Sequence, residues 1–277
     1  MAIISKILIP IDFSERCLGA ARFAIPLAER FHSEITLLHV APAPGPDWNV
    51  NAEREERANR QLRDFLCAAF AHLDAKRVLR EGSPAQEIVA YAREDQSDLI
   101  MMPTRGYGAF RQLLLGSVTA KVLHDADCPV WTGAHLAKGP SAEWINPTTI
   151  LCAADANPGS EKALVWASQL ASELDAALLL VHVDPRLKPA NEEDLEKYQH
   201  KILADSNRRM EELQSAAGTR AQVFIEPGNI PRAVSAAAEH LDADLLVIGR
   251  GSGRAPGRLG LNTYGIIRES RCPVVSV

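Results

Sequence analysis

The chain has 277 residues, of which 47% are apolar and 23% charged, proportions typical of an ordinary globular protein. Thirty Lys and Arg stand against 35 Asp and Glu, so the net charge is −5. An acidic chain without a basic block binds phosphate backbones poorly, which disfavours nucleic acid as a partner. No apolar run approaches the roughly 18 residues of a membrane-spanning helix, so we expect no membrane partner. The opening residues lack a secretory pattern, and we therefore expect a cytoplasmic protein.

The first half of the chain alternates short apolar runs with helical patterns. The runs are continuously apolar or nearly so, as in strands buried on both faces of a parallel sheet. They are Ile7–Ile11, Ile35–Val40, Arg77–Leu79, Leu99–Met102 and Val130–Trp131. The helical patterns between them are Ser14–Phe31, Glu53–His72, Pro84–Arg93 and Gly116–His124. We expect Ser14 to cap the first helix and Pro26 to bend or weaken it.

The second half repeats the first. The run that ends at Asp12 returns in the run that ends at Asp155, 143 residues later, and Leu37–Val40 returns as Leu180–Val183. Matches in the same order along a whole half indicate a duplicated domain. We predict domain 1 in residues 1–135, a linker in 136–147 and domain 2 in 148–277. The alternation predicts an α/β fold with two tandem, doubly wound, five-stranded parallel sheets.

Cysteine and histidine are dispersed along the chain. The five cysteines form no C-x-x-C pair, and no Cys/His cluster has zinc spacing. We therefore predict free thiols and no protein-held metal.

Ligands of an open parallel sheet bind beyond the carboxyl ends of its strands, where the strand order reverses. Asp12 and Asp155 each end the first strand of a half. Such a carboxylate either accepts hydrogen bonds from a ribose or adenine edge or caps the following helix.

A glycine-bearing segment follows the fourth strand of the first half. It contains Gly106 and Gly108 and leads to Gly116-Ser117-Val118-Thr119 at the start of the last helix. Glycines and a helix N-terminus together form a phosphate cradle, whereas the alternative is an ordinary turn with a capped helix. The chain contains no P-loop motif, and no G-x-G-x-x-G follows the first strand of either half.

Several motifs lie along the chain: the opening Ile-Leu-Ile-Pro-Ile-Asp-Phe-Ser, Leu-Leu-His-Val, Glu-Gly-Ser-Pro, and Leu-Gly-Ser-Val-Thr followed by Cys-Pro-Val. By these motifs the whole chain resembles a tandem pair of universal stress protein domains. The resemblance implies the strand order 3-2-1-4-5 and, from the ATP-binding signature G-x2-G-x9-G-[ST], an ATP site with or without magnesium. Carried over by position, the site residues are Asp12, Val40, Arg105, Gly106, Gly116, Ser117, Val118 and Thr119.

This chain departs from that signature in both halves. Pro103 replaces the first glycine and removes one N–H donor. In the second half, only seven residues separate Ser252 from Gly260, and Leu261 stands where a hydroxyl residue is expected. Tyr264, in the place of Ala120, is expected to crowd the site. We therefore predict a degenerate second site that binds nucleotide weakly or not at all.

The last strand of each half lies at a sheet edge, and an unpaired edge strand invites pairing. In the family such strands pair antiparallel between domains, which implies pairing of the two halves within the chain and a possible homodimer.

Three functions are compatible with the sequence. The leading hypothesis is a stress-response protein that binds ATP or a related adenine nucleotide, chiefly in domain 1, as a regulatory or sensing module. The alternative is a dimeric interaction scaffold that works without nucleotide. An enzyme is disfavoured, since no nucleophile–base pair is evident, and we expect at most slow ATP hydrolysis. His39 and His182 fall within strands and are expected to be core residues.

Overall fold

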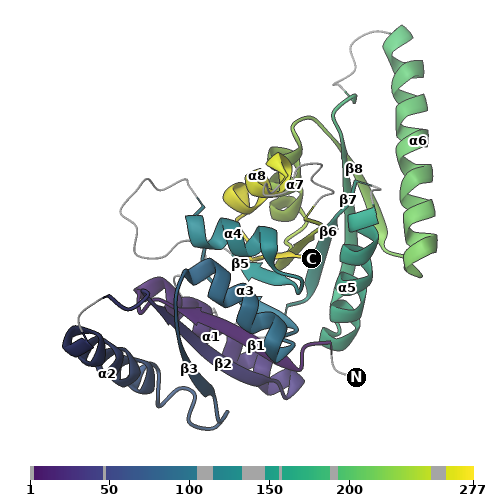
Figure 1. Cartoon of the computed structure of the whole chain (residues 1–277). Coiled ribbons are helices and arrows are strands. Elements are labelled where there is room, and N and C mark those ends of the chain that lie inside the picture. The colour runs from purple at the N-terminus through teal and green to yellow at the C-terminus, as the bar shows by residue number, and fades with distance from the viewer. Residues whose placement is uncertain are drawn as a thin grey trace. The chain divides into compact units, whose positions relative to one another are not determined.

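The computed structural model describes residues 3–45, 48–104, 115–132, 147–155, 158–187, 193–250 and 260–277. The chain divides into two compact units, Met1–Ile145 and Asn146–Val277, which we call the first and second half (Figure 1). Among the described residues, no helix has both the length and the apolarity needed to cross a membrane. Pairing between the halves and a homodimer stay predictions.

The first half is a five-stranded parallel sheet with four helices in its described residues. Its strand order is β3-β2-β1-β4-β5, which confirms the expected 3-2-1-4-5 arrangement. In chain order its elements are β1 (Lys6–Ile11), α1 (Glu15–Phe31), β2 (Glu34–Ala41), α2 (Trp48–Asp64), β3 (Lys76–Glu81), α3 (Pro84–Asp95), β4 (Leu99–Met101), α4 (Ser117–Asp125) and β5 (Val130–Thr132).

The second half repeats this architecture. Its strands lie in the order β10-β9-β6-β7-β8, which is the same arrangement counted from the other edge. Its elements are β6 (Thr149–Ala153), α5 (Pro158–Leu174), β7 (Ala177–Asp184), α6 (Glu193–Ala217), β8 (Gln222–Pro227), α7 (Ile230–His240), β9 (Leu245–Ile248), α8 (Leu261–Glu269) and β10 (Val274–Ser276).

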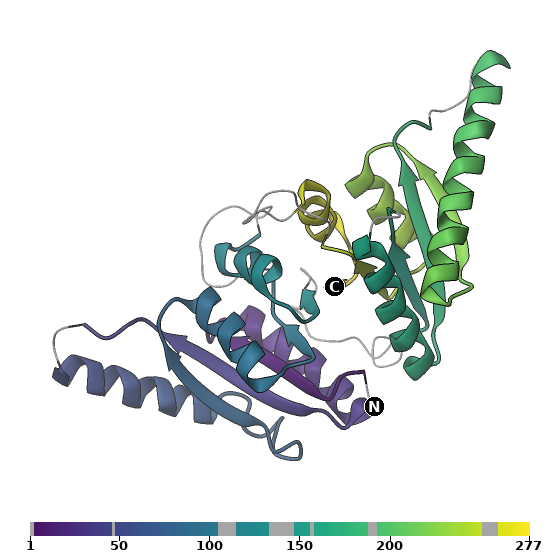
Figure 2. The ribbon, with the colours of Figure 1, turned by 45° about the vertical axis from the view of Figure 1, so that its right-hand side comes forward.

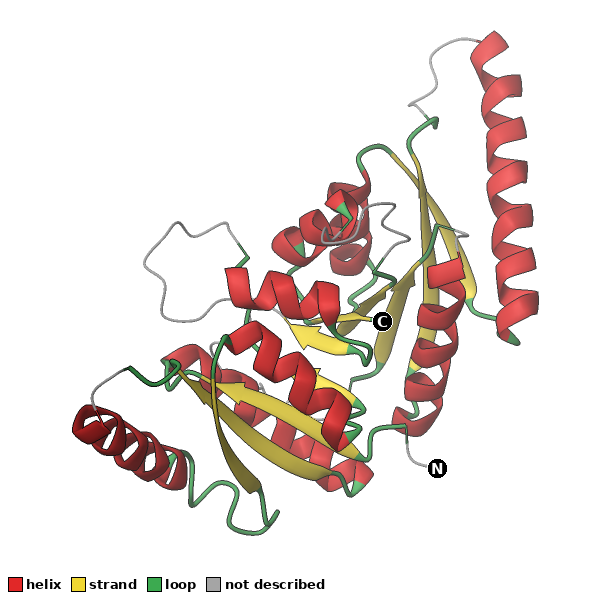
Figure 3. Cartoon of the chain, in the orientation of Figure 1, coloured by secondary structure: helices red, strands yellow, loops and turns green. Residues whose placement is uncertain are grey.

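Central strands and helices together enclose a core in each half. The central strands are almost fully buried, as in β4 and β9, whose residues are at most 2% exposed. The helices pack against the sheets, as Figure 3 shows for both halves. In the second half α5 packs against α6 and α7 against α8, and α6 lies along β7 and β8 (Figure 2).

The first helix follows the sequence closely. Ser14 is its N-cap, and the Ser14 hydroxyl accepts the N–H of Cys17 at 3.4 Å. The helix buries a stripe of small residues and continues past Pro26 to Phe31 without a break. The proline therefore does not end the helix, because burial of this stripe outweighs one missing backbone hydrogen bond.

The second helix differs from the expected Glu53–His72. It begins at Trp48 and ends at Asp64, and turns follow over residues 65–74. Leu66 adopts a positive φ of 45°, which a helix does not tolerate. Phe70 lies within these turns and is buried, with 1% of its surface exposed. The polar amphipathic pattern continues beyond Asp64, but the chain leaves the helix there and buries this aromatic ring.

Candidate functional site

The strand order of the first sheet reverses between β1 and β4, so the carboxyl ends of these strands mark the expected ligand site. Asp12 follows the last residue of β1. The parallel register pairs Ile11, directly before Asp12, with His39, directly before Val40. The two predicted site residues therefore follow paired positions of neighbouring strands.

The Asp12 carboxylate is held by donors at the start of α1. Its Oδ1 accepts the Ser14 N–H at 3.0 Å, the Ser14 hydroxyl at 2.6 Å and the Cys17 thiol at 2.7 Å. Burial, followed by the neighbouring negative charge of Asp12 and the hydrogen bond to it, raises the pKa of Cys17 to about 12. The thiol therefore stays protonated and serves as a donor. Asp12 does not itself cap α1, because Ser14 is the N-cap, but it holds Ser14 in place, and its own carboxylate is fixed in position.

Phe13 was not expected at the site. It has a φ of 59°, an uncommon conformation for a bulky residue, and such strain concentrates at functional sites. Its ring lies 4.4 Å from the His39 ring, centroid to centroid, and 6.0 Å from that of Phe65. His39 Nδ1 lies 2.7 Å from the Ile11 carbonyl oxygen. Because a carbonyl can only accept, Nδ1 carries the proton. The motif Asp-Phe-Ser gave no signal for this conformation.

The N-terminus of α4 provides the other side of the candidate site. Gly116 is its N-cap, with no side chain capping the helix, and Ser117 is exposed. The Gly116 N–H donates to the Thr104 carbonyl at 2.8 Å, and the buried Thr119 hydroxyl donates to the Pro103 carbonyl at 3.1 Å. These two donors are therefore used within the protein.

The first-turn residues Ser117 and Val118 remain at the helix mouth, where backbone N–H groups lack intrahelical acceptors. Arg105 and Gly106 lie outside the described residues.

The second half reproduces these contacts with different side chains. Ser160 takes the place of Cys17 and donates its hydroxyl to Asp155 Oδ1 at 2.6 Å. The buried His182 places Nδ1 2.8 Å from the Ala154 carbonyl oxygen, as His39 does with Ile11. The Thr263 hydroxyl lies 3.4 Å from the Gly249 carbonyl oxygen. Both histidine rings bond a carbonyl at a strand end. His182 is buried, as expected of a core residue, whereas His39 is half-buried.

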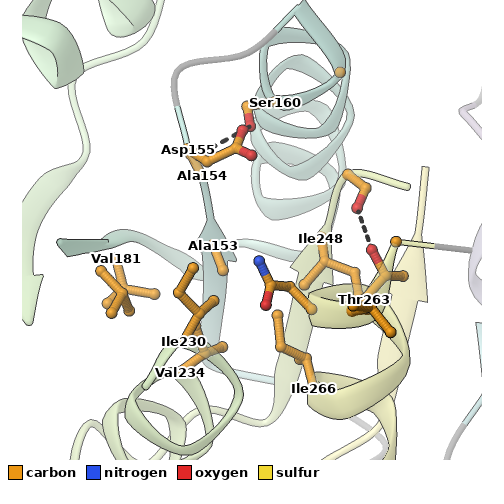
Figure 4. A pocket seen from close by; sticks show the side chains of 16 residues that line it. Ala153, Ala154, Asp155, Ser160, Val181, Ile230, Val234, Ile248, Thr263 and Ile266 are labelled. Carbon is orange, nitrogen blue, oxygen red and sulfur yellow. Dashed lines mark hydrogen bonds between the residues drawn. The ribbon is translucent and has the colours of Figure 1, made fainter. Parts of the chain in front are cut away.

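A pocket of about 330 Å³ lies in the second half, at the carboxyl ends of β6, β7 and β9 (Figure 4). It is lined by residues in or next to these strands, α7, α8 and the first turn of α5: Ala153, Ala154, Asp155, Gly159, Ser160, Val181, Val183, Ile230, Val234, Ile248, Gly249, Gly260, Leu261, Asn262, Thr263 and Ile266. Sequence reasoning did not foresee an open pocket in this half.

Two features explain why this pocket is open. Tyr264 does not line it, and the expectation that this ring crowds the site is wrong. Thr263 faces the strand ends, and the next helical residue is rotated by about 100° away from them. In addition, Gly249 replaces Pro103. A Cβ at Gly249 would lie 3.0 Å from the Gly159 carbonyl oxygen, so only glycine fits without displacement. Gly249 was therefore the feature of the sequence that could have predicted the open pocket.

The described lining of the pocket contains little charge. Among the described residues that line it, Asp155 alone is ionisable. Arg250, directly after Gly249, donates Nε to the Ser276 hydroxyl at 3.3 Å and Nη2 to the Ser276 carbonyl at 3.1 Å. Its guanidinium is thus held on β10. The described residues include no group of three or more His, Cys, Asp or Glu arranged to hold a metal ion.

Comparison with known proteins places this architecture in one family. The model of the universal stress protein family matches residues 4–132 and again 147–277, and the chain therefore belongs to this family as a tandem two-domain member. A universal stress protein of Methanocaldococcus jannaschii is 35% identical over 135 residues, which cover 45% of this chain and 79% of that protein. Another, from Thermus aquaticus, is 35% identical over 130 residues, covering 45% of this chain and 94% of that protein.

A solved structure shows the same fold over the full length. The crystal structure of a universal stress protein from Archaeoglobus fulgidus superimposes with a TM-score of 0.72 at 23% identity. The match covers 98% of this chain and 95% of that one. The tandem arrangement of two such domains is therefore shared.

Proposed function

We propose that the protein binds ATP or a related adenine nucleotide in its first half and acts as a regulatory module of a cytoplasmic stress response. The observation that carries the proposal is the pairing of two features at the switch point of the first sheet. The Asp12 carboxylate is fixed by three hydrogen bonds just after β1, the strand next to the one that carries Val40, and α4 begins without a side-chain cap. A fixed carboxylate is suited to bind the polar groups of a nucleoside, and an uncapped helix N-terminus is suited to bind an anion.

The residues have distinct tasks in this proposal. The Asp12 carboxylate accepts hydrogen bonds from the ribose or the adenine edge, next to Val40. The N–H groups of Ser117 and Val118 and the Ser117 hydroxyl receive phosphate oxygens, helped by the partial positive charge of a helix N-terminus. Thr119 supports the site, because its hydroxyl is bonded to the Pro103 carbonyl.

Two further predicted residues and the metal complete the proposal. Arg105 and Gly106 extend the phosphate contacts, since an arginine pairs well with phosphate. Magnesium enters with the phosphates, as is usual for this ion at nucleotide sites, and needs no protein cage.

A thermal-shift series with ATP and magnesium tests the proposal, because a ligand specific for the native state raises its stability by about 2.7 kcal/mol at one hundred times its Kd. We expect ATP to raise the melting temperature of the wild type by several degrees. Asp12→Ala should abolish the shift, whereas Asp155→Ala, the same change at the matching position of the second half, should leave it intact.

A second pair of variants separates binding from folding. Asp12→Ala also removes the acceptor that orders the start of α1. Ser117→Asp instead places an acidic residue where a helix N-terminus favours it, yet repels phosphate. We expect this variant to melt like the wild type and to lose the ATP shift. Leu261→Asp is its counterpart at α8. A shift that survives Ser117→Asp and disappears in Leu261→Asp would contradict a first-half site.

One set of observations favours a scaffold that works without nucleotide. Pro103 offers no N–H, and both the Gly116 N–H and the Thr119 hydroxyl are already bonded within the protein. Under this alternative, millimolar ATP leaves the melting temperature of the wild type unchanged, and calorimetric titration gives no heat.

A further inference from the structure

We infer that β8, the outer strand of the second half, is a surface through which two copies of this chain associate, by antiparallel pairing of one β8 with the other. The inference goes beyond the nucleotide site proposed for the first half and does not depend on it. It also concerns a different edge from the last strands, β5 and β10, for which the sequence predicts pairing.

The backbone of β8 has bonding groups that point away from the sheet. Among the described residues, β8 has a neighbouring strand on one side only (Figure 1). The Val181 carbonyl of β7 accepts the Ala154 N–H next to β6, so His182, one residue later, points its backbone groups toward β8. In a parallel ladder such a residue bonds the neighbours of the residue opposite it. Ile225, opposite His182, therefore points its N–H and carbonyl outward, as does Val223 two residues earlier.

The matching edge strand of the first half is protected by charge, and β8 is not. The six residues of β3, KRVLRE, include one lysine and two arginines, and such side chains on an edge strand discourage pairing with another chain. The parallel registers match these positions to those of β8, QVFIEP, which contains no basic residue. Its apolar run, residues 223–225, is only half-buried. Of the two edge strands, β8 is therefore the better template for a further strand.

Two copies of β8 can exchange backbone hydrogen bonds about a two-fold axis. With Val223 opposite Val223 of the partner subunit, each of the two residues donates its N–H to the carbonyl of the other. The Ile225 N–H then reaches the carbonyl of Ala221 of the partner subunit, and symmetry repeats this bond. The Ala221 N–H is not needed, because it already donates to Gln214 Oε1. The outward groups of β8 thus satisfy one another.

The charges at the two ends of β8 favour this register over its neighbours. When the extended pairing includes the residues just before β8, the exposed Arg220 stands opposite Glu226 of the partner subunit, and the two-fold axis repeats the pair. A shift of the register by two residues places Arg220 opposite Phe224 or Gly228 instead, and both charge pairs are lost. The strand is therefore complementary to itself in charge as well as in backbone, which points to a second copy as its partner.

Sedimentation velocity on the full-length chain, over a series of concentrations, tests the inference. We expect the wild type to convert from monomer to dimer as its concentration rises. Glu226→Arg places like charges opposite each other at both ends of the pairing and should weaken the dimer at least about tenfold. Addition of Arg220→Glu recreates the two pairs with reversed polarity and should restore the Kd of the wild type, a result that requires direct contact between the two positions.

Two further variants control for charge and for folding. Glu81→Arg makes the same change of charge at the exposed end of β3 and should leave the dimer unchanged. Both arginine variants reduce the net negative charge equally, so a difference between them does not arise from overall charge. Gln222→Lys gives β8 the lysine that β3 has at the matching position, and it should weaken the dimer. Gln222 is exposed, and circular dichroism shows whether each variant is folded.

The outcomes separate this inference from the proposed function. A wild type that stays monomeric up to millimolar concentration would overturn the pairing of β8. A dimer that is as tight in Glu226→Arg as in the wild type would also overturn it and would favour the last strands as the interface. Failure of Arg220→Glu to restore the dimer would contradict the proposed register and with it the choice of partner. The ATP shift in melting temperature reports on the first-half site alone, so either idea can fail while the other stands.

Discussion

Replacing Asp184 by alanine should loosen α6 from the end of β7. Asp184 is 4% exposed, and its carboxylate accepts hydrogen bonds from the Ser206 hydroxyl of α6 at 3.0 Å and from Arg186 Nη2 at 2.6 Å. Ser206 is fully buried. The first half has Ala41 at the position that matches Asp184. The end of β2 therefore lacks the carboxylate on which this network depends.

The expected loss follows from what the substitution leaves behind. Asp184→Ala leaves the Ser206 hydroxyl buried without its acceptor, which costs about 1–3 kcal/mol. Arg186 is 48% exposed and regains water, so it adds little to the cost. We therefore expect the free energy of opening of α6 to fall by about 2 kcal/mol.

The same contact has a pH dependence of known sign. The hydrogen bond from the Arg186 guanidinium, reinforced by the Arg186 backbone N–H and the Ser206 hydroxyl, lowers the pKa of Asp184 despite its burial. A depressed pKa in the folded state stabilises the protein fully above the unfolded-state value of about 4. This contribution is lost as the pH falls below that value. The stability difference between wild type and Asp184→Asn should therefore be constant near neutral pH and shrink below about pH 4.

Amide hydrogen exchange of α6 and β7 measures the local effect, and thermal unfolding followed by circular dichroism measures the pH dependence. Asp205→Ala is the matched control, since Asp205 also pairs with Arg186 but is partly exposed, and it should have a smaller effect. Unchanged exchange in α6 of Asp184→Ala would refute the reasoning, as would a stability difference that grows on acidification.

Three further predictions concern packing and the candidate site. At pH 8 iodoacetamide should modify the exposed Cys67 and leave Cys17 intact, because burial raises the pKa of Cys17 to about 12; equal labelling in a mass spectrum would contradict this. Gly265→Ala should destabilise the protein by about 1–3 kcal/mol, since a Cβ there would lie 2.6 Å from a proline ring carbon of α7; Asn262→Ala, on the same helix, is the control in thermal unfolding. Thr119→Val should cost about 1–2 kcal/mol by leaving the carbonyl after β4 without its donor, and a melting temperature equal to that of the wild type would exclude this role.

The sequence by itself determined the repeated architecture and the equivalence of its positions. Continuous apolar runs mark buried parallel strands wherever they occur, and the 143-residue repeat assigns Asp155 to the place of Asp12. The structure gives both carboxylates a bonded hydroxyl or thiol donor five residues later, from Cys17 or Ser160. Such features are local in sequence or repeated in it, and therefore readable without coordinates.

Only the tertiary structure decided which donors are used and where space remains. A motif names Thr119 as a hydroxyl residue, but its direction depends on a carbonyl 16 residues away. The left-handed Phe13 has its ring against the His39 ring of another strand, a contact that its local sequence does not reveal. The second-half pocket is the volume left where side chains of β6, β7, β9, α7 and α8 fail to meet. Each of these outcomes depends on packing between segments that are distant in the sequence. The order of residues along one segment does not determine such packing.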